Sequence, residues 1–228
     1  MGTIRLLIGI GLFSFSLCSS ALAFSGFGYE IDGYIKESAQ RYQVSEAMLR
    51  GLIKMEDGWY GKVSPSGATG IGQFTVKTWN WLAQKPEGKA IGMKAITSKT
   101  KGTSADPRRN KRINTLATGL LARWHIEQFA ERQIMPTDAN LYMAHNIGLE
   151  GLHRAMQGRS TQEDIENMRK NGMKRWMNPT DFIAYQKGRY YQQWQLANTM
   201  HHHIASISSP VKWIEPTSVN RIKWVNPL

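Results

Sequence analysis

The sequence has 228 residues, of which 41% are hydrophobic and 20% are charged, and its formal net charge at pH 7 is +12. This length suits one compact domain and is short for two. The single cysteine, Cys18, excludes a disulfide framework within the chain. The excess of positive charge indicates an anionic partner, and charge alone does not choose among cell-wall polymers, lipid headgroups and nucleic acid.

Residues 1–23 are predicted to be a secretory signal peptide. Arg5 precedes an apolar run from Leu6 to Leu17, and Ala21-Leu22-Ala23 is a small-x-small cleavage pattern. The run is shorter than the about 20 residues that a transmembrane helix needs. A lipid anchor on Cys18 is disfavoured because a large leucine precedes it. We therefore expect a periplasmic or otherwise exported protein, without a membrane anchor or a cysteine after cleavage.

Most of the remaining apolar spacing is helical, with residues recurring at intervals of three and four. The predicted helices cover about 30–42, a segment that begins after Ser45 and stops at Gly58, Ile113 to Trp124, Ala139 to Ile147, Thr161 to Arg169, and Thr180 to about Met200. This pattern predicts a mainly α domain over residues 24–203.

Two segments interrupt the helical pattern. Residues 85–112 hold nine Lys or Arg against two acidic residues, Glu87 and Asp106. This basic insertion is interpreted equally well as a solvated loop or as a flap over an anionic substrate. Residues 204–228 contain three prolines and are predicted to form an extended tail that packs on the domain or docks a partner.

Glu56 is the most informative residue of the second predicted helix. It follows the apolar positions Leu52 and Ile53 at helical spacing, so its carboxyl group faces the apolar side. Burial disfavours the charged form and raises the pKa, which suits a general acid near neutral pH. The alternative is a carboxylate in solvent or paired with Lys54 or Lys62.

A turn rich in small residues follows, from Ser64 to Phe74. Its three glycines allow a backbone or a ligand to approach closely, and Gln73 can both donate and accept hydrogen bonds. Judged by its composition alone, this segment is as typical of a hairpin-like turn between helices as of a ligand-binding loop.

Three blocks of sequence carry a resemblance to a known family. Glu56 is followed by Gly67-Ala68-Thr69-Gly70-Ile71-Gly72-Gln73-Phe74 and then by Met143-Ala144-His145-Asn146-Ile147-Gly148. In this order they resemble the lytic transglycosylases of the soluble type, which are related to goose lysozyme, over roughly residues 31–194. Two departures are Asp57, where the family usually has Ser, and His145, where it usually has Tyr.

The resemblance implies a lysozyme-like helical domain with a substrate groove and a non-hydrolytic reaction on peptidoglycan. Glu56 would protonate the bond between N-acetylmuramic acid and N-acetylglucosamine, the muramyl N-acetyl group would attack its own anomeric carbon, and a 1,6-anhydro product would form. Gln73 and Asn146 would bind substrate. Near its reference pKa of about 6.5, His145 would gain charge beside a sugar as pH falls.

Other positions are weaker predictions. Tyr185 and Tyr190 lie where the family has a late active-site tyrosine, although helical packing favours a core position for each. Trp59 is close enough to Glu56 to line a sugar subsite. No cofactor or metal is expected, because the adjacent residues His201, His202 and His203 do not easily converge on one ion.

Two alternatives to the lytic activity stay open: a hydrolytic muramidase, and an inactive glycan-binding or assembly scaffold with the same fold. A nucleic-acid partner is disfavoured by export and by the absence of aromatic residues within the basic insertion. A small exported domain also suits an enzyme that opens the wall locally for a secretion, conjugation or pilus machine.

Overall fold

The computed structural model describes residues 24–205, with side chains through Thr199, and this part of the chain is mainly helical. The expected signal peptide and most of the expected tail therefore lie outside the described residues. The described helices are α1 Tyr29–Tyr42, α2 Glu46–Glu56, α3 Val76–Gln84, α4 Pro86–Ala90, the 3-10 helix η1 Pro107–Arg109, α5 Lys111–Glu131, α6 Asp138–Ile147, α7 Leu149–Met156, α8 Gln162–Lys170 and α9 Pro179–Ala205.

The start of α2 follows the predicted capping, whereas its end differs by one residue. Ser45 Oγ accepts a hydrogen bond from the Met48 amide at 3.0 Å. The left-handed residue at the other end is Asp57, with φ of 56°, and not Gly58 as predicted. Gly58 is needed for close packing instead, because a Cβ there would lie 2.2 Å from the Gly70 carbonyl oxygen.

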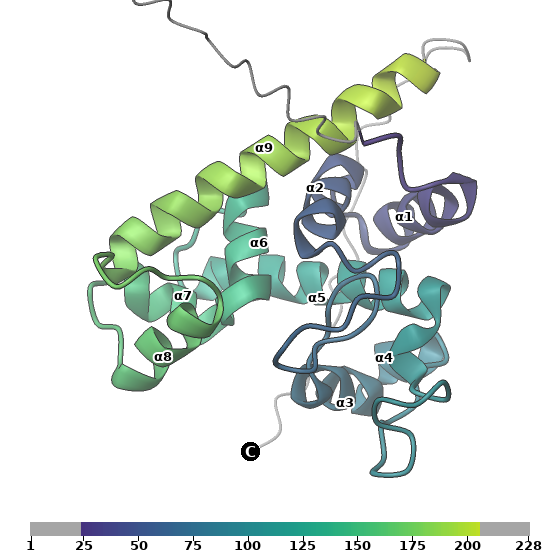
Figure 1. The fold of residues 1–228 in the computed structure, drawn as a ribbon, viewed down its shortest axis with the longest axis horizontal. Helices are drawn as coiled ribbons and strands as arrows, with labels where there is room; N and C mark the ends of the chain where they lie inside the picture. The colour runs from purple at the N-terminus through teal and green to yellow at the C-terminus, as the bar shows by residue number, and fades with distance from the viewer. Residues whose placement is uncertain (1–23, 206–228) are drawn as a thin grey trace, which may run out of the picture.

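Helix α5 runs through the centre of the domain (Figure 1), and α1, α4 and α6 pack against it. Leu116, Ala117 and Leu120 are fully buried, so α5 is covered on most of its circumference. Helix α1 approaches it at Gly119, where a Cβ would lie 2.2 Å from Ser38 Oγ. The two helices are joined there by the Ser38 hydroxyl, which donates to the Thr115 carbonyl. This central position of α5 explains why its sequence has no single apolar face.

Helix α9 lies across the top of the molecule in Figure 1, over α2 and α6. Its side chains make polar contacts with the backbone of α2: Asn198 Nδ2 donates to the Ala47 carbonyl at 3.1 Å, and the Tyr190 hydroxyl donates to the Met48 carbonyl at 3.3 Å. The helix continues to Ala205, two residues beyond the predicted start of the extended tail. Helix α2 is therefore enclosed between α1 and α9.

Three described α-helices were not among those predicted: α3, the five-residue α4 and α7. Helix α7 directly follows α6, with only Gly148, at φ of 82°, between them. The positive φ of this glycine ends α6 at Ile147, where the prediction also ended it; α7 has only eight residues, so its own periodic signal is short. Helix α3 has only nine residues, which is about two and a half turns and gives a short periodic signal.

The basic insertion is anchored to the core and is more than a solvated loop. Ile91, Met93 and Ile96 are buried. Trp79 Nε1 donates to the Lys94 carbonyl at 2.8 Å, and the Asn80 side chain makes two hydrogen bonds with the backbone of Ile96. The segment between α4 and η1 therefore packs as irregular chain on α3.

Part of the positive charge of this insertion is neutralised. Arg108 pairs with Asp106, Lys111 with Glu30, and Arg112 with Glu37. The exposed basic residues of the insertion without an ion pair among residues 24–199 are Lys89, Lys94, Lys99, Lys101 and Arg109. The positive charge that the insertion can offer to an anionic partner is therefore smaller than its nine Lys and Arg residues imply.

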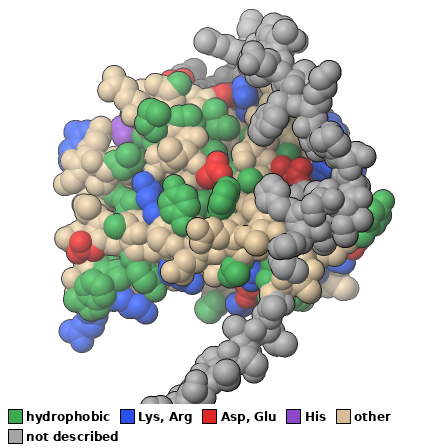
Figure 2. All heavy atoms as spheres, turned by 90° about the horizontal axis from the view of Figure 1, so that it is seen from above, with side chains coloured by type: hydrophobic (Ala, Val, Ile, Leu, Met, Phe, Trp, Pro, Cys, Tyr) green, Lys and Arg blue, Asp and Glu red, His purple; other side chains and the backbone are tan. Residues whose placement is uncertain are grey.

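The face seen from above carries a mixed set of side chains. Figure 2 shows basic, acidic and hydrophobic side chains interspersed there. The excess positive charge is thus not gathered into one field on that face. Among the helices between residues 24 and 205, none is both long and apolar enough to cross a membrane.

The Arg108 side chain is buried and ties together three segments. Its guanidinium donates to both Asp106 carboxylate oxygens and, through Nη1, to the carbonyls of Gly67 at 2.9 Å and Phe74 at 2.8 Å. Burial alone would raise the pKa of Asp106, but hydrogen bonds from Arg108 and from the Gly102 and Arg108 amides bring it down to about 2. The pair therefore stays ionised at any pH at which the protein works.

Arg108→Ala is expected to lower the free energy of unfolding by about 3–5 kcal/mol, because it leaves the Asp106 charge buried without its partner. The adjacent Arg109→Ala removes an exposed side chain with one hydrogen bond to the Thr103 carbonyl and should cost about 1 kcal/mol or less. Urea unfolding followed by tryptophan fluorescence measures both. Equal losses in the two variants would show that the buried pair is not a main support of the fold.

Candidate active site

Glu56 lies at the last turn of α2, beside the buried Leu52 and Ile53. Its side chain is half-buried. Burial raises the pKa of the Glu56 carboxyl to about 8, against the opposing charge of Arg189. The carboxyl group therefore holds its proton at neutral pH, as an apolar setting predicts.

Neither neighbouring lysine pairs with Glu56. Lys62 Nζ lies 3.1 Å from Asp57 Oδ2, and Lys54 Nζ lies 4.9 Å from the centroids of the Phe24 and Trp59 rings. The alternative of a Glu56–lysine ion pair is thus wrong. Asp57, which follows Glu56, also hydrogen-bonds the Tyr60 hydroxyl, so its carboxylate is used in the loop that follows α2.

Tyr142 on α6 is a neighbour of Glu56 that the sequence analysis missed. Its ring is buried and stacks on Tyr190 of α9, with 5.0 Å between centroids. Burial raises the pKa of Tyr142, and the charge of Glu56 adds to the rise. The available signal was helical spacing, because Tyr142 precedes Asn146 by four residues and so shares its face of α6.

The glycine-rich turn is held against the loop that follows α2. Gln73 has φ of 48°, and its Nε2 donates at 2.9 Å to the carbonyls of both Lys62 and Gly70. The side-chain oxygen Oε1 takes part in neither bond. Gln73 is therefore oriented by its amide nitrogen and retains an acceptor oxygen.

The side chains of Asn114 and Arg108 hold the glycine-rich turn through hydrogen bonds to its backbone. Asn114 Oδ1 accepts from the Gly72 amide at 2.7 Å, while its Nδ2 donates to the Arg108 carbonyl at 2.8 Å. Both side chains are buried. Sequence reasoning missed both as supports of the site, because the partners are backbone groups about 30 to 45 residues away in the chain.

His145 connects α6 to the turn. Its Nε2 lies 2.8 Å from the Gly72 carbonyl oxygen, so Nε2 is the donor nitrogen. The ring also packs edge-on against Phe74, at 5.7 Å between centroids. Burial lowers the pKa of His145 below 6.5, and the hydrogen bond to Gly72 opposes that shift. A charge change of His145 at pH 6.5, expected from the sequence, is thus displaced to lower pH.

Asn146 lies next to His145 and contacts the segment after α8. Its Nδ2 donates to Asn171 Oδ1 at 3.4 Å. Its Oδ1 is buried, and among the described residues no hydrogen-bond partner reaches it. A buried acceptor without a partner is rare in proteins and indicates a place for a ligand or water.

The two tyrosines of α9 have different surroundings. Tyr190 is fully buried, with its hydroxyl on the Met48 carbonyl, so it has no surface for a ligand and belongs to the α2–α9 packing. Tyr185 is 38% exposed, and the Arg189 guanidinium lies 5.8 Å from its ring centroid. Of the two candidates, only Tyr185 is accessible.

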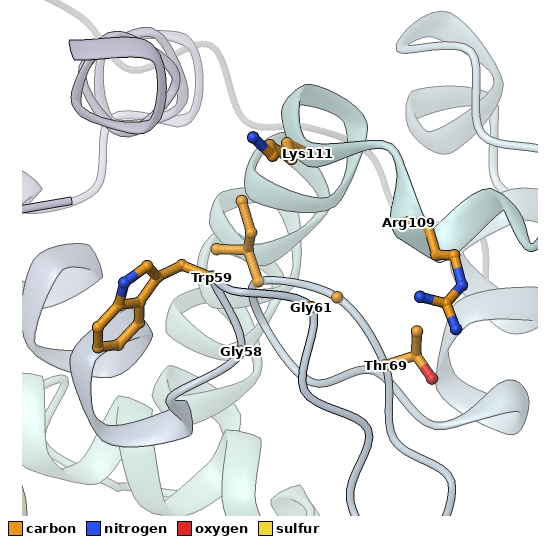
Figure 3. A pocket seen from close by; sticks show the side chains of 8 residues that line it. Gly58, Trp59, Gly61, Thr69, Arg109 and Lys111 are labelled. Atoms are coloured by element: carbon orange, nitrogen blue, oxygen red, sulfur yellow. The ribbon is translucent and has the colours of Figure 1, made fainter. Parts of the chain in front are cut away.

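Trp59 lines a pocket between the loop after α2, the glycine-rich turn and the start of α5. Figure 3 shows its ring on one side of the Gly58–Gly61 loop, and Thr69 and the Arg109 guanidinium on the other. Lys111 also lines the pocket, and Glu56 does not. The expected sugar contact of Trp59 would therefore be at a position separate from Glu56. Within residues 24–199, no group of three or more His, Cys, Asp or Glu side chains is placed to hold a metal ion.

Comparison with known proteins agrees with the three sequence blocks. No curated protein matches this chain. The family model described as the transglycosylase SLT domain matches residues 33–168, which include Glu56, Gln73, His145 and Asn146 but not α9. The chain therefore belongs to the SLT family of lytic transglycosylases, within the lysozyme-like superfamily.

Proposed function

We propose that this protein is an exported peptidoglycan lytic transglycosylase in which Glu56 acts first as general acid and then as general base. The observation that carries the proposal is the half-buried carboxyl group of Glu56, whose pKa is raised to about 8 and which neither Lys54 nor Lys62 neutralises. A general acid must hold a proton at the working pH, and this setting supplies that condition.

The reaction proceeds in two steps. The Glu56 carboxyl group donates its proton to the glycosidic oxygen between N-acetylmuramic acid and N-acetylglucosamine, while the muramyl N-acetyl oxygen attacks the anomeric carbon and the glycosidic bond breaks. The Glu56 carboxylate then removes the proton of the muramyl C6 hydroxyl, whose oxygen displaces the acetyl oxygen at the anomeric carbon. The product is a 1,6-anhydro sugar, and no water is consumed.

The surroundings of Glu56 favour this route over one with two carboxylates. Glycosidases that hydrolyse by the usual mechanisms have a second Asp or Glu across the bond. The nearest acid in sequence, Asp57, is engaged by Tyr60 and Lys62. Since the substrate supplies its own nucleophile, one carboxyl group suffices.

The other site residues have supporting roles in the proposal. Gln73 Oε1 and Asn146 Oδ1 are acceptors for amide or hydroxyl groups of the sugars. Tyr185 lies on the exposed side of α9. Trp59 lines the pocket that Glu56 does not reach. His145 orients the Gly72 carbonyl and contacts a sugar only at its remaining ring edge.

A role in opening the wall for a secretion, conjugation or pilus machine is the narrower form of this proposal. It is supported by the predicted signal peptide and by a single small domain that would be carried to a local site. Loss of assembly of such a machine in cells that carry only Glu56→Gln, with restoration by the unaltered chain, is the test.

Glu56→Gln is expected to reduce cleavage at least about a hundredfold, because the amide keeps the shape of the side chain but cannot transfer a proton. Mass spectrometry of digested peptidoglycan measures the rate and shows whether the ends are 1,6-anhydromuramic acid. Asp57→Asn, next in sequence, is the matched control and should retain most activity. Reducing ends in place of anhydro ends would identify a muramidase. Substantial turnover by Glu56→Gln would show that Glu56 does not transfer the proton.

The activity should decline as pH rises above about 8. The pKa of Glu56 is raised to about 8, so the acid is protonated below this pH and loses its proton above it. We expect kcat/KM to fall about tenfold per pH unit on the alkaline side, measured on soluble glycan strands in buffers of equal ionic strength. An alkaline limb near pH 5 would contradict the raised pKa.

Stability gives an independent measurement of the same pKa. The unfolded Glu56 titrates near 4.5 and the folded one near 8, so the unfolded state releases its proton first, and stability declines as pH rises between these values. Glu56→Gln lacks this decline and should be more stable than the unaltered chain at pH 8 by roughly 1–3 kcal/mol. Equal stability of the two at pH 8 would show that folding does not raise the pKa of Glu56.

The exposed lysines of the basic insertion are expected to attract the anionic wall without taking part in the chemical step. Changing Lys94, Lys99 and Lys101 to Gln should weaken binding to sacculi at low salt, and the difference should fade at about 0.15 M salt, where the screening length is about 8 Å. Turnover of short soluble glycans should be unchanged. The matched control replaces three exposed lysines of other elements, Lys36, Lys77 and Lys170; equal weakening by both sets would show that only net charge matters.

A further inference from the structure

The packing of α9 against α2 places Arg189 opposite Glu56. Near the start of α2, Asn198 contacts the Ala47 carbonyl. One turn later a Cβ on Gly51 would lie 2.8 Å from Trp194 Cδ1. The two helices therefore run in opposite directions: a step of four residues forward along α2 matches a step of four residues back along α9. One more such step brings residue 189 to the level of residue 56. The charge of Arg189 accordingly acts on both Glu56 and Tyr142.

The Arg189 guanidinium is held in position by its own helix, and within residues 24–199 it has no counter-charge. Nη1 donates to Gln186 Oε1 at 3.3 Å, and the group lies over the Tyr185 ring. Among the described residues, no carboxylate lies within 4.0 Å of it, whereas Arg50, Arg132 and Arg154 all have one. Arg189 is also exposed. Its positively charged N–H groups are therefore available to donate hydrogen bonds to a ligand beside Glu56.

A chain of hydrogen bonds joins Arg189 to the ligand-facing amide of α6. Gln186 is buried, and its Nε2 donates to the Asn171 carbonyl at 2.6 Å. Asn171 Oδ1 accepts in turn from Asn146, whose own Oδ1 is buried without a partner. The hydrogen bond that Arg189 donates to Gln186 limits the positions open to its guanidinium, and the chain of bonds places Arg189 on the same side of the molecule as Asn146.

We propose that Arg189 binds a carboxylate of the muramyl part of the substrate and so selects muramyl glycans over neutral chitin-type glycans. This inference rests on the proposed function, because it assumes that Glu56 acts on a muramyl bond. The muramyl residue carries a lactyl group, whose carboxyl is free in strands without peptide and is joined to a stem peptide, with carboxylates of its own, in intact wall.

The guanidinium chemistry suits this ligand. Arginine presents a planar set of donors that matches a carboxylate with two parallel hydrogen bonds, and charge-assisted bonds of this kind are about twice as strong as neutral ones. N-acetylglucosamine has no anionic group to occupy these donors. A carboxylate bound to Arg189 would also offset the charge that now favours the ionised form of Glu56, so the anionic ligand and the general acid are compatible neighbours.

The test is a binding comparison in the full chain carrying Glu56→Gln, which keeps the ligand intact. Calorimetry would give Kd for three oligosaccharides of equal length: a muramyl glycan with free lactyl carboxylates, the same glycan with stem peptides, and chitooligosaccharide. Adding Arg189→Gln should weaken at least one muramyl ligand by about tenfold or more and change the chitooligosaccharide by less than about twofold. Arg189→Lys should recover part of the loss, because it restores the charge.

The two carboxylate sources are separated by the same data. Loss confined to the peptide-free glycan identifies the lactyl carboxylate, loss confined to the peptide-bearing glycan identifies the stem peptide, and loss on both shows that either carboxylate is accepted. Equal changes on all three ligands, or none on any, would overturn the proposal. Arg159→Gln, which removes an exposed arginine of the α7–α8 connection, is the control for net charge.

Failure of this inference is distinguishable from failure of the proposed function. Continued cleavage by Glu56→Gln would reject the role of Glu56 whatever Arg189 binds. With Arg189→Gln, an unchanged ratio of Kd for the muramyl glycans to Kd for chitooligosaccharide, together with unchanged kcat/KM on both muramyl glycans when Glu56 is intact, would reject only the carboxylate contact.

Discussion

The candidate site depends on the hydrogen bonds and the ion pair of the buried Arg108 guanidinium. The guanidinium neutralises Asp106 and joins the carbonyls of Gly67 and Phe74, the first and last residues of the Gly67–Phe74 block within the glycine-rich turn. Such a turn has little apolar surface of its own and would not be held by hydrophobic burial. Because the turn is tied to the residues before α5, Gln73 keeps a defined position relative to the end of α2.

The glycines of the turn are required by the closeness of this packing. A Cβ on Gly70 would lie 2.1 Å from Asn114 Nδ2, and one on Gly72 would lie 2.2 Å from Thr118 Oγ1. Gly70 also has φ of 85°, which side chains with a Cβ rarely adopt. The glycine pattern by which the family is recognised therefore reflects the approach of the turn to α5, and the same approach brings the Gly72 carbonyl within reach of His145.

Helix α9 completes the surroundings of Glu56 from outside the segment that the family model matches. It encloses α2 through Tyr190 and Trp194 and carries Arg189 to the level of Glu56, with Tyr185 one turn further along α9. The apolar packing beneath raises the pKa of Glu56, while the arginine above limits that rise. The pKa of Glu56 is thus set by a balance between burial and one nearby charge.

The sequence alone determined the mainly helical fold, the Ser45 cap, and the family, because periodicity, capping residues and a glycine block are local signals. It also indicated the apolar setting of Glu56, since helical spacing decides which side a residue faces. Only the tertiary structure decided that Tyr190 is core, that His145 bonds a carbonyl, and that Arg108 is buried. These depend on which backbone groups meet across 30 to 140 residues of chain, and no periodicity within one segment encodes such contacts.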